Sequence, residues 1–454
     1  MKKTLLILLS FWVSTLAQAQ DSIQLTLNEA ITFALENSYP SINASRDIEA
    51  AKKKKWETTT MGLPHIDAAV NYQNWLKQQV SLIPADFFGG NEGEYQEVAF
   101  GTKHNMTATA TLNQLIFDGS YLVGLQSAKV YLKISENAKV KTDLGIREAV
   151  INAYGNVLLS KKSINILEKN IATLQKNLNE TIVIYKNGLT EEENVEQLNI
   201  TLASLKSQYS KTVKLYEIAK KMLNITLGID INTEIYLTDS LEELASAYTN
   251  FIALNTNFNV ENHIDYKIAQ NTERSNELLV KLEQSKALPR LSSFINFSYA
   301  GYGEEFQFFE KDQQWFDSSL LGVSLNIPIF SSLARSSRTQ QAKIELEKAK
   351  TNLTEIEQRL QLNLQQAKTE YAYSLEELVT AKQNLNLAER IENKNQIKFF
   401  EGLATSFELT EAQRQLYTMQ QNYLQAMLNV ITSKANLDNA LNTPITTTTY
   451  QNEN

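Results

Sequence analysis

Two hydrophobic periods alternate along the chain. Over most of its length apolar residues recur every three or four positions, which predicts amphipathic helices. In a few short stretches they alternate with polar residues, which predicts half-buried strands. Residues 28–61 follow the helical period, and Pro40 predicts a bend or a restart within them. At Pro64 the period changes to two, so a helix leads directly into a strand.

The first two strands form a predicted hairpin over residues 64–117. Their apolar positions are Ile66, Ala68, Val70 and Tyr72 in the first strand and Met106, Ala108, Ala110 and Leu112 in the second. The residues between these positions are mostly Thr, Asn, Asp and Gln. Each strand therefore has one apolar and one polar face, and it is long enough to cross a bilayer when it is tilted.

Very long helices follow the hairpin. Residues 120–187 contain no Pro, so an unbroken helix there would approach about 100 Å at ~1.5 Å per residue. Gly188 ends this helix as a C-terminal glycine does. The four residues from Thr190 have a capping-box pattern, which predicts a further helix over 190–227. Residues 229–262 change character and are interpreted as a linker with small irregular elements.

The unit then repeats. Leu288-Pro289-Arg290-Leu291 parallels Leu63-Pro64-His65-Ile66, and Gly402 lies 214 residues after Gly188. The second copy predicts a hairpin over 289–330 and long helices over 332–400 and 405–441. The predicted divisions are a leader over 1–19, a first repeat over 20–228, the linker over 229–262, a second repeat over 263–441 and a disordered tail over 442–454. A repeat of this length decides the fold class.

The long helices also have heptad seams. The seam residues are Leu346, Ala349, Leu353, Ile356 and Leu360 in one helix and Leu409, Ala412, Leu416, Met419, Tyr423, Ala426 and Val430 in the next. Each seam needs a facing helix, so we expect antiparallel coiled-coil pairs. Any coiled-coil scaffold would satisfy these seams equally well.

Composition narrows the function classes. Lys2 and Lys3, an apolar run and a small-residue site at Ala17–Ala19 predict a cleaved export signal. The formal charge of −8 becomes more negative once these lysines leave, so a nucleic-acid partner is not expected. The chain has no Cys, which excludes disulfides and thiolate sites. Its three histidines, His65, His104 and His263, show no ligand spacing, and we expect neither a metal, a cofactor nor an enzymatic activity.

The strands point to an assembly. Four strands cannot close in one chain, and a sheet inside a bilayer must have every edge paired. Several chains would have to pool their strands. The aromatic residues Tyr72, Trp75, Phe297 and Tyr299 lie toward the loop ends of the strands, as in an interfacial girdle. The alternative is a soluble sandwich hairpin in which these aromatic residues belong to an ordinary core.

The sequence resembles the outer membrane efflux protein family, the TolC-like channel-tunnels. The resemblance rests on the duplication, the Leu-Pro-x-Ile/Leu openings of the hairpins, the Asn326-Ile327-Pro328-Ile329-Phe330 closing and the Gly-Leu turns. It implies a mainly α protein with a small β part. Three copies would form a twelve-stranded outer-membrane barrel on a periplasmic helical barrel, with an equatorial belt at 229–262 and the tail. The implied partners are a periplasmic adaptor, an inner-membrane transporter and outer-membrane lipid. The implied function is a passive exit duct for efflux or type I secretion.

Two acidic residues follow Gly402. Glu408 and Glu411 share a helix face, and in a trimer six such carboxylates would ring the narrow end of a tunnel. The resemblance implies this pore-lining role, because the family has acidic residues six and nine places after this glycine. The first repeat has Asn194 and Gln197 there. The alternative is that Glu408 only completes a capping box with Thr405. Ala404 occupies the place of a turn arginine that latches some family members.

The exposed turns have a second candidate role. The resemblance implies that such turns meet the helical hairpin of the adaptor, and their small residues would permit close packing. The turn residues are Gly188, Leu189, Thr190, Gly402, Leu403, Ala404 and Thr405. Turn geometry alone explains them equally well. A second function class is a periplasmic or surface coiled-coil structural protein without a pore, and the sequence does not identify a substrate.

Overall fold

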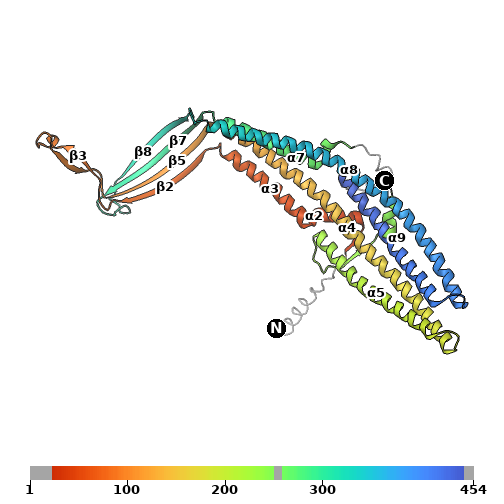
Figure 1. The fold of residues 1–454 in the computed structure, drawn as a ribbon. Helices are drawn as coiled ribbons and strands as arrows, with labels where there is room; N and C mark the ends of the chain where they lie inside the picture. The colour runs from red at the N-terminus through yellow and green to blue at the C-terminus, as the bar shows by residue number, and fades with distance from the viewer. Residues whose placement is uncertain (1–22, 250–257, 444–454) are drawn as a thin grey trace, which may run out of the picture. The chain divides into compact units, whose positions relative to one another are not determined.

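The computed structural model describes residues 23–249 and 258–443, so the predicted leader and most of the predicted tail lie outside the described residues. The chain is mostly helical with a small sheet part, as expected (Figure 1). The longer helices are α2 (Leu27–Asn37), α3 (Tyr39–Thr60), α4 (Gly119–Lys186), α5 (Glu192–Leu227), α6 (Leu241–Ala247), α7 (Ile264–Ser285), α8 (Ala334–Phe400) and α9 (Ser406–Ala440). The strands are β1 (Ile23–Leu25), β2 (His65–Asn74), β3 (Val80–Pro84), β4 (Tyr95–Ala99), β5 (His104–Asp118), β6 (Ile235–Leu237), β7 (Arg290–Gly303) and β8 (Trp315–Asn326).

The contacts divide the chain into two compact units. We call them the helical unit (Met1–Ile48, Ile134–Gln270 and Asn352–Asn454) and the strand unit (Glu49–Lys133 and Asn271–Thr351). Each unit takes segments from both halves of the sequence. The compact units therefore do not coincide with the two predicted repeats, which remain an interpretation of the sequence pattern.

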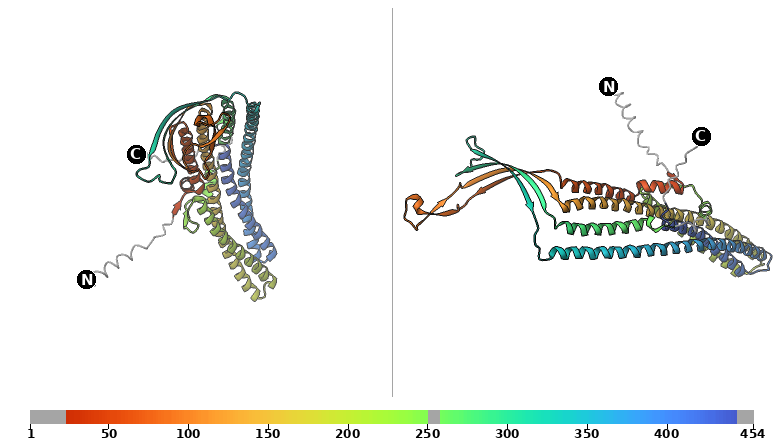
Figure 2. Two further views of the ribbon diagram at one scale, coloured as in Figure 1. Left: turned by 90° about the vertical axis from the view of Figure 1, so that its left-hand side faces the viewer. Right: turned by 90° about the horizontal axis from the view of Figure 1, so that it is seen from above.

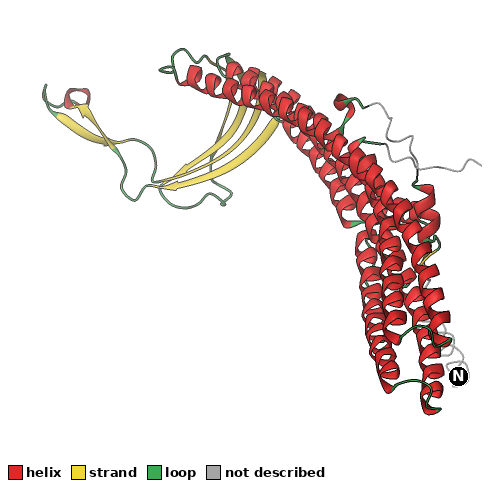
Figure 3. Cartoon of the chain, turned by 45° about the vertical axis from the view of Figure 1, so that its right-hand side comes forward, coloured by secondary structure: helices red, strands yellow, loops and turns green. Residues whose placement is uncertain are grey.

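The strand unit contains one four-stranded antiparallel sheet in the order β2-β5-β7-β8 (Figure 1). Figure 3 shows the strands in yellow. Both predicted hairpins are present, and β5 pairs with β7 to join them. Within the described chain, the outer edges of β2 and β8 have no strand partner. The stretch between β2 and β5, which the sequence indicated only as polar and Gly-containing, contains a further ribbon of β3 and β4.

The helix ends of the strand unit follow the order of the strands. The ends of α3, α4, α7 and α8 lie side by side, each connected to its own strand of the sheet (Figure 2). The Tyr121 hydroxyl of α4 donates to the Thr59 carbonyl of α3 at 3.0 Å, and the Ser120 and Ser285 hydroxyls join α4 to α7 at 3.3 Å. None of the described helices has an apolar stretch long enough to cross a bilayer.

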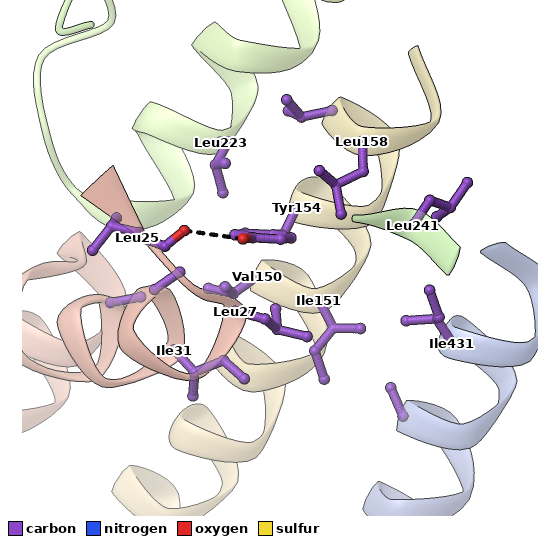
Figure 4. Packing of buried hydrophobic residues seen from close by; sticks show 14 of the residues in the cluster. Leu25, Leu27, Ile31, Val150, Ile151, Tyr154, Leu158, Leu223, Leu241 and Ile431 are labelled. Carbon is purple, nitrogen blue, oxygen red and sulfur yellow. Dashed lines mark hydrogen bonds between the residues drawn. The ribbon is translucent and has the colours of Figure 1, made fainter. Parts of the chain in front are cut away.

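The core of the helical unit surrounds Tyr154 of α4 (Figure 4). Its side chain is fully buried among apolar residues of α2, α4, α5, α6 and α9. Its hydroxyl lies 3.0 Å from the Leu25 carbonyl and 2.9 Å from the Asp239 carboxylate, which also accepts the Leu27 amide at 2.7 Å. Burial and this acidic neighbour raise the pKa of Tyr154. The described part of the linker is thus fixed to the core, and it contains the short strand β6, which pairs with β1.

The first predicted helix is two helices. α2 ends at Asn37 because Ser38 is extended (φ −66°, ψ 146°), and α3 begins one residue before Pro40. Proline fits the first turn of a helix, where its missing N–H is not needed. Gly228 at the end of α5 approaches this break. A Cβ at position 228 would lie 2.2 Å from the Asn37 carbonyl oxygen, and the backbone there has φ +83°, so the position requires glycine.

The helix α9 is more buried than a two-helix seam predicts. The Ser374 and Ser433 hydroxyls join it to α8 at 2.7 Å. On another face, the Asn170 amide of α4 donates to the Gln420 oxygen of α9 at 2.8 Å. The heptad pattern identified one apolar seam, but α9 packs between two long helices and therefore buries additional small and polar residues.

Candidate functional site

The two turns between the long helices have the same backbone geometry. Gly188 has φ +73° and Gly402 has φ +74°. The Leu189 amide donates to the Ile184 carbonyl at 3.1 Å, and the Leu403 amide donates to the Lys398 carbonyl at 2.8 Å. Both are helix ends closed by a left-handed glycine. A Cβ at either glycine would meet nothing within 4 Å. These glycines are therefore required for their backbone conformation and not for close packing within the chain.

The helix starts after the two turns differ. At Thr405 the predicted capping box is present: the Glu408 amide donates to the Thr405 hydroxyl at 3.2 Å, and the Thr405 amide donates to the Glu408 carboxylate at 2.8 Å. The capping box predicted from Thr190 is wrong. α5 starts at Glu192, so Glu191 is the N-cap and caps no amide with its side chain. The Thr190 hydroxyl instead accepts the Asn194 side-chain amide at 2.7 Å.

Glu408 and Glu411 are both exposed and both have a lowered pKa. For Glu408 the cause is the backbone amide and hydroxyl of Thr405. For Glu411 it is Arg414, whose guanidinium donates to both carboxylate oxygens at 2.6 and 3.0 Å. Both carboxylates are therefore ionised at neutral pH, but Arg414 offsets the charge of one of them. We did not single out Arg414 in the sequence, although Glu and Arg three positions apart on a helix are a known pairing signal.

The turns expose apolar side chains. Leu189 and Leu403 occupy matching positions after the two glycines and are 77% and 73% exposed. Phe407, which the sequence analysis did not select, is 69% exposed near Leu403 in the sequence. Ala404 and Thr405 complete the second turn, where Thr405 caps α9. The seven predicted turn residues thus form two separate turns with apolar tips, and the second turn has the larger apolar surface.

A layer of buried and half-buried polar side chains, which we call the buried polar layer, lies close behind the turns. We use this name for Asn177 of α4, Glu392 and Gln396 of α8, and Thr410 and Gln413 of α9. Gln413 is 1% exposed, and neither its amide nitrogen nor its oxygen makes a hydrogen bond of good geometry. Asn177 accepts the Gln396 amide at 3.1 Å but leaves its own amide nitrogen unpaired, and the Thr410 hydroxyl is also unpaired.

Glu392 is the acidic member of this layer. Burial raises its pKa, and the neighbouring Gln413 amide only partly offsets that effect. In the part of the chain that the structure describes, no Lys or Arg forms an ion pair with it. Burial and Glu392 also raise the pKa of Tyr417 on α9. The sequence pattern did not reveal this layer, because single polar residues among exposed helix positions look like solvent-facing ones.

The histidines do not gather. His104 accepts or donates a 2.8 Å hydrogen bond with the Tyr72 hydroxyl, and His263 is buried at the start of α7 with a pKa lowered by that burial. Among the described residues, no group of three or more His, Asp or Glu side chains is arranged to hold a metal ion.

Comparison with known proteins agrees with this architecture. Residues 261–443 match the family model described as outer membrane efflux protein. The fold is similar to that of the outer membrane protein VceC from Vibrio cholerae, with TM-score 0.69, 16% identity and coverage of 92% of this chain and 96% of that chain. It is also similar to the Campylobacter jejuni CmeC outer membrane channel, with TM-score 0.71, 15% identity and coverage of 92% and 85%. No curated protein matches the chain in sequence.

A third similar structure is the open state of the Neisseria gonorrhoeae MtrE outer membrane channel, with TM-score 0.65, 14% identity and coverage of 92% and 88%. At these identities the structural matches show the fold, while the family match rests on the sequence of residues 261–443. Residues 261–443 thus match the outer membrane efflux protein family in sequence, and the fold over most of the chain is similar to that of solved outer membrane channels.

Proposed function

We propose that the protein is the outer-membrane duct of a tripartite efflux pump or a type I secretion system. In this role it is a passive exit for substrates that an inner-membrane transporter delivers through a periplasmic adaptor. The observation that carries the proposal is the four-stranded sheet, which has one mostly apolar face, one mostly polar face and, among the described residues, two outer edges without a strand partner. Three copies joined edge to edge would form a closed barrel of twelve strands.

The faces of the sheet support this assembly. On one face Ile66, Val70 and Leu321 are large, apolar and exposed, which suits contact with lipid. On the other face Thr107, Thr109 and Thr111 follow one another along β5, and the Thr109 hydroxyl lies 3.0 Å from that of Ser298. This polar face suits a water-filled lumen. Since an unpaired sheet edge is not viable in hydrocarbon, β2 of one copy would pair with β8 of the next.

The proposed duct continues as a periplasmic helical barrel built from α4, α5, α8 and α9 of three copies. Residues 229–262 would form an equatorial belt around it. The support is that β6 and α6 of this segment contribute Ile235 and Leu241 to the core around Tyr154. A belt fixed to the core in this way would hold the long helices together at one level.

At the entrance we propose that Glu408 and Glu411 line the pore. Both are exposed and ionised, so three copies would present a ring that favours cations. Because Arg414 is bound to Glu411, Glu408 would supply most of the unopposed charge. Protonation of Glu408 would also weaken the capping box, so selectivity and helix capping share one carboxylate.

The adaptor would meet the turns. The proposed docking residues are Gly188, Leu189, Thr190, Gly402, Leu403, Ala404 and Thr405. Their support is exposure: the leucines are exposed at the turns, and no described residue lies within 4 Å of a Cβ placed at either glycine. Phe407 adds a large apolar side chain to the second turn.

Single-channel recording tests the proposal. Purified protein should migrate as a trimer and should form ohmic, cation-selective channels in planar bilayers. A matched variant with Val70→Asp on the apolar face should fail to insert, whereas Thr109→Asp on the polar face should insert and conduct. Trimers that bind no membrane and pass no current would favour the alternative, a periplasmic or surface coiled-coil protein without a pore.

A further inference from the structure

The segment between β7 and β8 folds back against the sheet. Phe308, in the middle of this segment, is 3% exposed. Its ring lies over Gly301: a Cβ at that position would be 3.1 Å from the Phe308 ring and 3.3 Å from the Trp315 ring. Residues 304–314, which we call the β7–β8 loop, therefore have a fixed packing partner on one face of the sheet.

The strand register identifies that face. Along β7, Gly301 shares a face with Ile295, Phe297 and Tyr299, because side chains alternate. Across the sheet Gly301 lies opposite Met106, which lies opposite Tyr72. These are all positions of the apolar face. The loop consequently covers the end of the apolar face and not the face that contains the β5 threonines.

The rings form a connected cluster. The Tyr72 and Phe306 ring centroids are 5.2 Å apart in an edge-to-face arrangement, and those of Phe306 and Phe308 are 5.5 Å apart. The Tyr72 hydroxyl is hydrogen-bonded to His104 at 2.8 Å. Such packed aromatic residues with a polar atom at one end are the type found at the boundary between headgroups and acyl chains.

The same loop also exposes apolar side chains, including one that belongs to the cluster. Phe309 is 84% exposed and Phe306 is 51% exposed, although both belong to an ordered loop. The residues around them are charged or polar, namely Glu304, Glu305, Gln307, Glu310, Lys311 and Asp312. The loop therefore places exposed aromatic side chains directly beside charged ones in the sequence.

We propose that the β7–β8 loop is a lipid-interface anchor in which Phe306 and Phe309 enter the headgroup boundary of the outer leaflet. The partner is bilayer lipid, because the cluster continues the apolar face and because copies of the chain would meet at strand edges, not at this face. The loop thus lies outside the barrel wall and leaves the lumen mouth free. This inference rests on the proposed function, in which the sheet spans the outer membrane.

Site-directed spin labelling tests it without background, because the chain has no cysteine. Four single-cysteine variants in liposomes are compared: Phe309→Cys, Phe297→Cys in the apolar face, Ser298→Cys in the polar face and Leu189→Cys in a helical turn. The readout is label relaxation by oxygen, which enters lipid, against a nickel chelate, which stays in water. The label at position 309 should give an oxygen-to-nickel ratio between those at positions 297 and 189.

The control labels distinguish a failure of the lipid-anchor proposal from a failure of the proposed function. If the label at 297 faces lipid while the label at 309 is as nickel-accessible as that at 189, the anchor is refuted and the barrel stands. If the label at 309 is shielded from both reagents, a protein covers the loop and the anchor is again refuted. If the label at 297 itself is in water, the proposed function fails as well. Adding Gly301→Ala to Phe309→Cys should raise nickel accessibility at position 309, because the new methyl group would lie 3.1 Å from the Phe308 ring and push the ring away from the sheet.

Discussion

The two turns of the helical unit share a backbone geometry and an exposed leucine, but they differ in capping and in charge. Gly188 and Gly402 have nearly the same φ, and each is followed by an exposed leucine. Only the second turn has a complete capping box and a pair of carboxylates. The first turn leads into a helix without a side-chain cap. The two turns therefore share their backbone geometry, while the capping box and the pair of carboxylates are specific to the second turn.

The largest expected effect on stability comes from replacing the left-handed glycine that each turn contains. Gly188→Ala and Gly402→Ala should each destabilise their own turn by about 1–2 kcal/mol, the cost of a left-handed conformation for a residue with a Cβ. Hydrogen–deuterium exchange of the flanking helix ends should accelerate about tenfold at the mutated turn and not at the other. Gly145→Ala, within α4, is the control. A much larger effect at one glycine would show that the two turns are not equivalent.

A smaller effect on stability is expected from removing the threonine hydroxyl before each helix, because only α9 is capped by it. Thr405→Ala removes the hydroxyl that caps α9 and should cost about 1 kcal/mol. Thr190→Ala removes only a hydrogen bond to Asn194 and should cost about a few tenths of a kcal/mol. The same exchange measurement applies, read at the first amides of α9 and α5. Equal acceleration at both helix starts would contradict the difference in capping.

The charge difference is tested by selectivity. Glu408→Gln should lower the cation-to-anion permeability ratio roughly twofold, and Arg414→Gln should raise it because Glu411 then loses its cation. Reversal potentials in asymmetric KCl give the ratio. Asn194→Glu, which adds a carboxylate at the matching place of the first turn, is the control for position. An unchanged ratio in both Glu408→Gln and Arg414→Gln would argue against pore lining.

The smallest effect concerns the buried polar layer. A carboxyl whose folded-state pKa is raised makes the folded state bind its proton more tightly. Its ionisation therefore costs stability as pH rises from the unfolded-state pKa through the folded-state pKa. Glu392→Gln should abolish this loss, so the variant should exceed the wild type in thermal stability at pH 7 and match it at pH 4. Glu389→Gln, an exposed neighbour on α8, should change neither value.

The sequence was sufficient to predict the strands and helices whose hydrophobic residues recur with a clear period. The alternation in β2 and β7 and the missing prolines of α4 and α8 predicted the hairpins and the long helices, because each signal extends over many residues. Local signals were less reliable. The capping pattern at Thr190 failed because α5 starts one residue later than the pattern requires, which makes Glu191 and not Thr190 the N-cap.

The remaining features depend on tertiary packing. Nothing local distinguishes Gln413 or Asn177 from exposed polar residues, since they become buried only when α4, α8 and α9 meet. Phe308 of the β7–β8 loop likewise packs on β7 at Gly301, where no side chain is in the way. A glycine in a strand can also mark a bulge or a bend, so the sequence alone does not predict this contact. Arg414 was visible in the sequence as a partner of Glu411, and attention to helical spacing would have found it.

The core around Tyr154 has a consequence for how the chain folds. It joins Leu25, Leu241 and Ile431, which come from the beginning, the middle and the end of the described sequence. Such contacts are very distant along the chain, so loop closure makes this core slow to form. A chain that emerges from a secretion channel in order would expose Leu25 and Tyr154 until α9 arrives. We therefore expect the exported polypeptide to depend on chaperones that shield its apolar segments during transit.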